Sequence, residues 1–430
     1  MFDEMKPEVL VVGAGPVGLF TALSLARKNV SVRILDTGVW ACTHSYALAL
    51  HPAALSLFDE LGLKERVLKD AYPVSKVAFY DKQQRRAEAS VDSPGACLAV
   101  LRQDNIENIL ESELEKAGVK VSWRHEAASI TPADDHAKVT VQKFEKESRG
   151  YIVAHTEWVV AKSFDLEPRF VVGADGYNSR VRRALNSEFP SLAPAQYYAV
   201  FEFKTDADLN HEVCVALDQN TADVLWPLPG GNCRWSFELP NFADPDIELR
   251  NESLRKAGFG DFPSERSKDR VLMSRGESAP VLDENNLRSL LAHRAPWFQG
   301  SIDKLSWRIV VRFEHRLATR YGAGPLWLAG DSAHLAGPAG IHSMNLGLFE
   351  GADLASTLAS ILRGGADPQI LNAYNDRWLP AWRQIHGLQN ALQPGPAADS
   401  WVAAHAPKIA ACLPAYGPAL AAMAAPLGLA

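Results

Sequence analysis

Asp331 stands between a short apolar strand and a loop rich in glycine and proline, in the stretch LWLAGDSAHLAGPAGIHSMNLG at 326–347. The pattern predicts a buried strand, a turn at Gly330-Asp331 and a helix that begins near Gly340. A carboxylate at a strand end can bind sugar hydroxyls. A helix start presents unpaired N–H groups and the positive end of the helix dipole to an anion. This stretch therefore predicts a ligand site.

A second ligand-binding pattern lies near the N-terminus, in VLVVGAGPVGLFTALSLARKNVSVRILD at 9–36. Gly13, Gly15 and Gly18, with Pro16 among them, match G-x-G-x-x-G between a predicted strand and a helix. The spacing suits a tight turn, close approach to a pyrophosphate and close helix–sheet packing. Asp36 ends the next strand, where a carboxylate can bind both ribose hydroxyls and disfavours a 2′-phosphate. Glycines at an ordinary turn are the alternative, but the complete βαβ unit favours FAD or NAD.

These two patterns lie far apart in the chain, which suggests one long cofactor held at both ends. FAD fits that requirement. A third pattern, Asp175-Gly176, follows the apolar run FVVGA, and its simple alternative is a turn.

Composition excludes several classes of function. With 430 residues, of which 47% are apolar, the chain can bury a large core, and its net charge of -7 argues against a nucleic-acid partner. The five cysteines are scattered without a C-x-x-C pair, which argues against a disulfide framework or a zinc site. No apolar run is long enough to span a bilayer, and no signal peptide is evident. We expect a cytoplasmic protein without a metal site.

The order of predicted elements indicates an α/β protein with interleaved domains. A Rossmann-like FAD-binding domain alternates with a β-sheet substrate domain, and a helical segment rich in alanine and proline follows. The expected FAD-binding parts are 1–72, 101–185 and 312–390, the substrate parts are 73–100 and 186–311, and the helical tail is 391–430. We expect the tail to pack on the FAD-binding domain; the alternatives are a membrane-surface helix or a subunit contact.

Three motifs, in a fixed order and spacing, connect this chain to a known family. They are GAGPVG at 13–18, GADG at 173–176 and LAGDSAH at 328–334. The chain resembles the single-component FAD-dependent aromatic hydroxylases, the para-hydroxybenzoate hydroxylase-like group, over roughly residues 8 to 385.

The resemblance implies a role for each matching position. Gly13, Gly15, Pro16, Gly18 and Asp36 would hold the ADP half of FAD, and Gln103, with Arg102 beside it, would contact the flavin cofactor. Asp175 would serve FAD positioning and the docking of NADPH or NADH, and Gly330-Asp331 would bind the ribityl chain. Pro338 would line the reaction site, and the helix start would aim its amides at the flavin pyrimidine edge. The residues of that helix start are Gly340, Ser343, Met344 and Asn345.

Two departures from the family pattern stand out. The family often has P-x-G-G-Q-G-x-N where this chain has PAGIHSMN at 338–345, and Tyr46 stands where an arginine is usual. His342 could therefore act as a proton donor or orient a phenol, or it could be a loop histidine that fills space.

The function implied by the resemblance is aromatic hydroxylation. NAD(P)H would bind transiently and reduce tightly bound FAD, O2 would give a flavin hydroperoxide, and an aromatic or polycyclic small molecule would take up one oxygen atom. The alternatives are a Baeyer–Villiger or reductase-type flavin oxidoreductase and a non-catalytic FAD-binding sensor. We expect a monomer or a homodimer.

Overall fold

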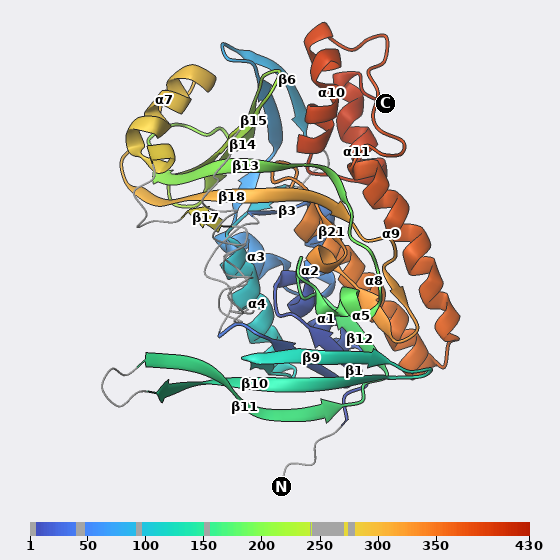
Figure 1. Ribbon diagram of the computed structural model, residues 1–430. Helices are drawn as coiled ribbons and strands as arrows, with labels where there is room; N and C mark the ends of the chain where they lie inside the picture. The colour runs from blue at the N-terminus through green and yellow to red at the C-terminus, as the bar shows by residue number, and fades with distance from the viewer. Residues whose placement is uncertain are drawn as a thin grey trace.

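The computed structural model of the protein describes residues 6–39, 48–91, 97–149, 155–240, 242, 271–273 and 280–430. Figure 1 shows the largest sheet at one end of the molecule, a three-stranded sheet at the other and most of the long helices between them. The predicted α/β class, with a Rossmann-like unit, a separate sheet unit and C-terminal helices, is confirmed.

The six-stranded sheet is the Rossmann-like unit. Its order is β19-β20-β12-β1-β2-β8, and every neighbouring pair except β19 and β20 is parallel. The strands are β1 Val9–Val12, β2 Val32–Asp36, β8 Val121–Trp123, β12 Phe170–Gly173, β19 Gly322–Ala323 and β20 Leu326–Leu328. β1 is buried along its whole length, as expected for a parallel sheet covered on both faces.

Helix α1 links β1 to β2 and packs closely against α8 (Figure 1). A Cβ atom on Gly351 of α8 would lie 2.3 Å from Thr21 Oγ1, and one on Gly347 would lie 2.6 Å from Val17 Cγ2. These glycines let the two helices approach closely. The helices that accompany this unit are α1 Pro16–Arg27, α2 Pro52–Glu60, α3 Lys64–Asp70, α4 Gln103–Lys116, α5 Arg180–Ala184, α8 His342–Gly364 and α9 Asn372–Ile385.

The largest sheet has nine strands in the order β17-β18-β13-β16-β15-β14-β5-β6, with β21 paired to β18. Its strands are β5 Lys76–Tyr80, β6 Arg85–Ser90, β13 Ser191–Lys204, β14 Glu212–Leu217, β15 Ala222–Leu228, β16 Asn232–Glu238, β17 Val271–Met273, β18 Leu305–Leu317 and β21 His334–Leu335. β18 crosses the domain limit that we expected at 311/312, and the domain limits stay predictions.

Two small sheets complete the fold. Their strands are β9 His125–Pro132, β10 Ala137–Arg149 and β11 His155–Leu166 in one, and β3 Ala49–Leu50, β4 Tyr72–Val74 and β7 Leu98–Val100 in the other. Among the described residues, the remaining helical elements are α7 Glu284–Arg294, α10 Ser400–Cys412, α11 Gly417–Ala424 and the 3-10 turns at Pro280–Leu282, Gly330–Ser332, Pro368–Leu371 and Ala425–Leu427.

The C-terminal helices lie on the large sheet, not mainly on the FAD-binding unit as we expected. Figure 1 shows α10 and α11 beside this sheet, where they contact β6 and β14. The Arg86 guanidinium lies over the Trp401 ring at 5.5 Å, and Lys408 Nζ donates to the Asp218 carbonyl at 2.8 Å. The apolar residues of α10 and α11 form one buried cluster with apolar side chains of β5, β6 and β14. Within the described residues, no helix is long and apolar enough to cross a membrane.

Candidate functional site

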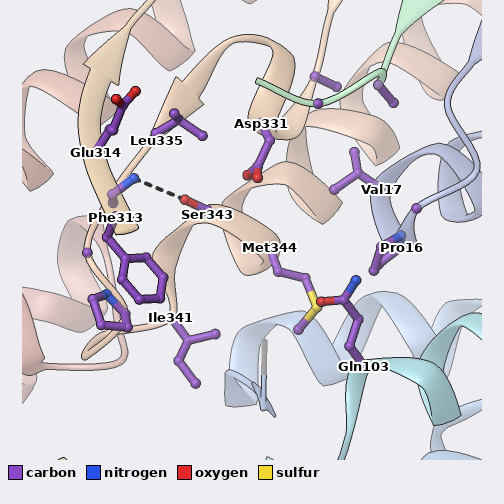
Figure 2. A pocket seen from close by; sticks show the side chains of 17 residues that line it. Pro16, Val17, Gln103, Phe313, Glu314, Asp331, Leu335, Ile341, Ser343 and Met344 are labelled. Atoms are coloured by element: carbon purple, nitrogen blue, oxygen red, sulfur yellow. Dashed lines mark hydrogen bonds between the residues drawn. The ribbon is translucent and has the colours of Figure 1, made fainter. Parts of the chain in front are cut away.

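A cavity of about 230 Å³, the first cavity, opens at the carboxyl ends of β1, β12 and β20. These strands are parallel neighbours, so their ends meet at one edge of the sheet, where α/β proteins commonly bind ligands. The structure brings three sequence motifs together here, and seven predicted site residues line the cavity: Gly15, Pro16, Gln103, Asp331, Pro338, Ser343 and Met344. Figure 2 shows Asp331 facing the cavity from one side, with Pro16 and Gln103 across from Ile341.

The turn of the first glycine motif requires glycine at two positions, Gly13 and Gly18, because any larger side chain would overlap the backbone. A Cβ on Gly13, whose φ is +105°, would lie 2.1 Å from the Ala174 carbonyl oxygen, and one on Gly18 would lie 1.9 Å from the Gly13 carbonyl oxygen. Gly15 differs, because a Cβ there meets no other residue within 4 Å and Gly15 lines the first cavity. Gly15 is also the N-cap of α1 and has no side-chain cap, so the helix start faces the open space. This geometry fits a bound pyrophosphate.

Asp36 lies at the end of β2, behind the glycine turn. Its carboxylate accepts hydrogen bonds from Ala14 N at 2.7 Å and from Gly38 N at 2.6 Å. The carboxylate therefore fixes the turn itself. Binding of a ribose by Asp36 stays a prediction.

The turn at Gly330-Asp331 is held from behind by a buried carboxylate. Glu350 Oε2 accepts from Gly330 N at 2.8 Å and lies 2.8 Å from His334 Nε2, while its Oε1 accepts from Trp382 Nε1 at 2.8 Å. The His334 ring stacks on Trp382, with ring centroids 3.7 Å apart. Glu350 was missed in the sequence. Its signal is an acidic residue in an otherwise apolar stretch of the helix, a position that requires buried partners.

The start of α8 forms the opposite wall. Ser343 Oγ accepts from Ala336 N at 3.2 Å, a contact drawn dashed in Figure 2, and Met344 points toward Gln103. Gly340 and Asn345 lie behind this wall, where Asn345 is fully buried.

Three predicted residues bond to other parts of the protein. Arg102, the N-cap of α4, forms an ion pair with Glu202 of the large sheet, with Arg102 Nη2 2.5 Å from Glu202 Oε2. The Asp175 carboxylate caps α5 through Arg180 N at 2.7 Å, its Oδ1 is buried without a partner, and burial raises its pKa. Gln103 lines the first cavity and donates to Glu107 at 2.8 Å. Tyr46 lies outside the described residues.

His342 lies behind the cavity wall. Its Nε2 is 3.0 Å from the Leu413 carbonyl oxygen and 3.2 Å from that of Ala415, and its ring meets His51 edge to face at 5.8 Å. Burial lowers the pKa of His342 to about 4 and that of His51 to about 3. A ring that is neutral at pH 7 and anchored to the C-terminal segment fits a structural role better than proton donation, which stays a prediction.

These two histidines should make the protein less stable in acid. The unfolded pKa of histidine is about 6.5, so the unfolded chain binds more protons than the folded chain as pH falls below 6.5. The contribution of His342 to the free energy of unfolding is therefore fully present above pH 6.5, and about 2 kcal/mol of it is lost by pH 5. We expect urea unfolding of His342→Gln, whose amide can still donate to Leu413, to show a correspondingly smaller loss between pH 7 and pH 5. His136→Gln, at an exposed ring, is the control; an unchanged pH dependence in His342→Gln would contradict this expectation.

A second, mostly apolar pocket adjoins the first cavity and shares three lining residues with it, Phe313, Pro338 and Ile341. Its other lining residues come mainly from one face of the large sheet: Leu48, Val200, Trp226, Arg234, Ser236, Trp307 and Val311. Trp307, Glu202, Arg234 and Trp226 form one row across four adjacent strands. Trp307, Glu202 and Arg234 were not identified from the sequence as part of a site.

Arg234 is the charged residue of the second pocket. Its side chain is 4% exposed, pairs with Glu202 and lies 4.7 Å from the Trp307 ring centroid. Glu202 also pairs with Arg102, so two arginines share one carboxylate, and the pocket combines aromatic walls with one fixed polar edge whose ion cluster keeps a net positive charge. Among the described residues, no three His, Cys, Asp or Glu side chains gather as metal ligands.

Residues 6–255 and 274–387 match the family model described as FAD binding domain. A 6-methylpretetramide 4-monooxygenase of Streptomyces rimosus is 27% identical over 382 residues, covering 87% of this chain and 59% of that protein. The chain thus spans about three-fifths of the length of this curated relative, 59%.

Two solved structures share the fold. The flavin-dependent monooxygenase PieE, in complex with FAD and substrate, matches with a TM-score of 0.67 at 19% identity, over 89% of this chain and 63% of that one. The p-nitrophenol 4-monooxygenase PnpA from Pseudomonas putida DLL-E4 matches with a TM-score of 0.66 at 20% identity, over 98% and 93% of the two chains.

Proposed function

The chain belongs to the FAD binding domain family, and from this premise we propose that it is a monooxygenase that hydroxylates an aromatic or polycyclic small molecule with NAD(P)H and O2. FAD is the cofactor of the family. The observation that carries the proposal is the contact between the first cavity and the second pocket through Phe313, Pro338 and Ile341. A ring in the second pocket would face FAD across these residues.

The residues of the first cavity fit FAD. Gly15 leaves room beside an uncapped helix start, which suits the pyrophosphate, and Asp331 faces the cavity where it can accept from ribityl hydroxyls. The start of α8, at Ser343 and Met344, offers a second set of helix N–H groups. When bound, FAD supplies the redox chemistry that activates oxygen.

The second pocket has a lining that suits a planar ring, and with a volume of about 20 Å³ its side chains must move apart to admit one. Trp226 and Trp307 give it flat apolar walls, and Arg234 and Ser236 give it two polar groups that can orient a ring oxygen. These side chains would bind the ring, fix its orientation and keep water away from the site of oxygen transfer. The Streptomyces rimosus relative is named as a monooxygenase, which supports oxygen transfer.

The test is oxygen incorporation by the FAD-loaded protein. NADH or NADPH consumption is measured in air with and without phenols, quinolones and polycyclic aromatics, peroxide is counted separately, and products are analysed after reaction under ¹⁸O₂. We expect at least one ring compound to stimulate consumption and to gain one labelled oxygen. Consumption that yields only peroxide with every compound, or a labelled lactone or ester in place of a phenol, would sink the hydroxylase assignment.

A further inference from the structure

Ile341 has a backbone conformation that isoleucine rarely adopts. Its φ of 48° and ψ of 41° place it in the left-handed region, at the N-cap of α8. Six other non-glycine residues in the described part of the chain have positive φ, and none of them is β-branched: Asn29, Arg124, Asn186, Asn210, His211 and Asn390. A β-branched side chain is strained in this region, so its surroundings must hold it there.

Asn345 holds Ile341 from the helix side. Its Nδ2 donates to the carbonyl oxygens of Ile341 and Ala49, both at 2.9 Å, and its Oδ1 accepts from His51 N at 2.7 Å. The amide is buried and uses both its oxygen and its nitrogen. The Ile341 carbonyl is therefore fixed in direction.

The C-terminal segment holds the turn from the other side. A Cβ on Gly340 would lie 2.2 Å from His342 Cε1 and 2.6 Å from the Ala411 carbonyl oxygen, so residue 340 must be a glycine. The His342 ring is itself tied to the carbonyl oxygens of Leu413 and Ala415. The turn cannot relax toward α10 without breaking these contacts.

The strained turn places the Ile341 side chain between the two cavities. Ile341 is 8% exposed and lines both of them, as do Phe313 and Pro338. Figure 2 shows Ile341 and Phe313 on the same side of the first cavity, across from Gln103. The second pocket has a volume of about 20 Å³, little more than one water molecule occupies. Side chains at its border therefore decide what can enter.

We propose that Ile341 is a specificity-determining residue whose side chain limits how large a ring system the second pocket admits on its side toward the first cavity. The assignment rests on the proposed function, because it requires a ring compound as ligand. A glycine would adopt the same backbone conformation without strain and would add the volume of the Ile341 side chain to the second pocket. Removing several carbons from an apolar wall changes discrimination between ligands of different size by about tenfold or more.

The test compares phenol, 1-naphthol and 9-phenanthrol, which have one, two and three rings, as ligands of the FAD-loaded protein. Their dissociation constants are measured from the change in the visible absorption of FAD, for wild type, Ile341→Gly and Ile341→Val. We expect Ile341→Gly to raise the affinity for 9-phenanthrol relative to phenol by about tenfold. Ile341→Val, which keeps the branch and removes one CH2, should change this ratio by no more than about fourfold.

Leu48→Ala is the matched control, because Leu48 is buried and lines the second pocket without lining the first cavity. Urea unfolding of each apo-protein checks that every variant is folded. An equal change in all three affinities in Ile341→Gly, or the same gain in Leu48→Ala, would overturn the role of Ile341. Failure of all three phenols to bind any variant would instead overturn the substrate class, and this assignment with it.

Discussion

Replacing Gly15 by alanine should weaken FAD binding by about 100-fold while the apo-protein keeps its fold. Apart from its neighbours in the chain, the added methyl group meets no residue within 4 Å, so the folded chain accommodates it. It points into the space of the first cavity, at the uncapped start of α1, where the pyrophosphate must approach the backbone closely. The stability of the apo-protein should change by no more than about 1 kcal/mol, the usual cost of alanine at an N-cap.

The measurement pairs an FAD titration, followed by quenching of flavin fluorescence, with urea unfolding of the apo-protein. Gly13→Ala is the contrasting variant, because its methyl group would overlap the Ala174 backbone at 2.1 Å and should destabilise the fold itself. Gly364→Ala, which adds a methyl group in open space at the end of α8, should change neither quantity by much. Tight FAD binding by Gly15→Ala would show that the pyrophosphate lies elsewhere.

The sequence predicted the Rossmann-like unit because its signals are local. The apolar run before Gly13, the glycine spacing and Asp36 at the end of β2 all lie within one βαβ unit. The structure brings Asp331 close to this turn because β1, β12 and β20 are parallel neighbours, whose carboxyl ends share one edge of the sheet. FAD contacts by the individual residues remain predictions.

The second pocket could not be read from the sequence, because it forms across strands that are distant in the chain. Glu202 and Arg234 are opposite each other on β13 and β16, and Trp235, between Arg234 and Ser236, faces the other side of the sheet into the core. Alternation along β16 shows two faces but not which one borders a ligand. Only the order of the strands in the sheet shows which face of β16 borders the second pocket.

His342 shows the same limit at a single residue. The sequence places it beside the flavin-binding loop, but its partners Leu413 and Ala415 lie 71 and 73 residues further along the chain. The C-terminal segment packs on the large sheet and reaches back to this loop, so it supports the same turn that carries Ile341. A segment with no motif of its own therefore helps to shape the site.

Replacing Glu350 by alanine should cost about 3–5 kcal/mol of stability and should also weaken FAD binding. The change leaves three donors without an acceptor in a dry core: Gly330 N, His334 Nε2 and Trp382 Nε1. The bond to Gly330 fixes the turn that carries Asp331, so its loss should misplace that carboxylate although Glu350 does not line the first cavity. Glu350 is therefore a positioning residue.

Stability alone cannot prove this role, so the comparison needs variants on the same helix. Leu358→Ala removes a fully buried side chain and should cost about 2–5 kcal/mol without touching the turn. Asp353→Asn, whose carboxylate binds Arg377 and Trp378 near the surface, should cost less than about 1 kcal/mol. Glu350→Gln, which keeps one acceptor oxygen, should fall between wild type and Glu350→Ala in both unfolding and FAD titration. If Glu350→Ala and Leu358→Ala lose FAD affinity equally when both are folded, the carboxylate contributes only to stability, and the position of Asp331 does not depend on it.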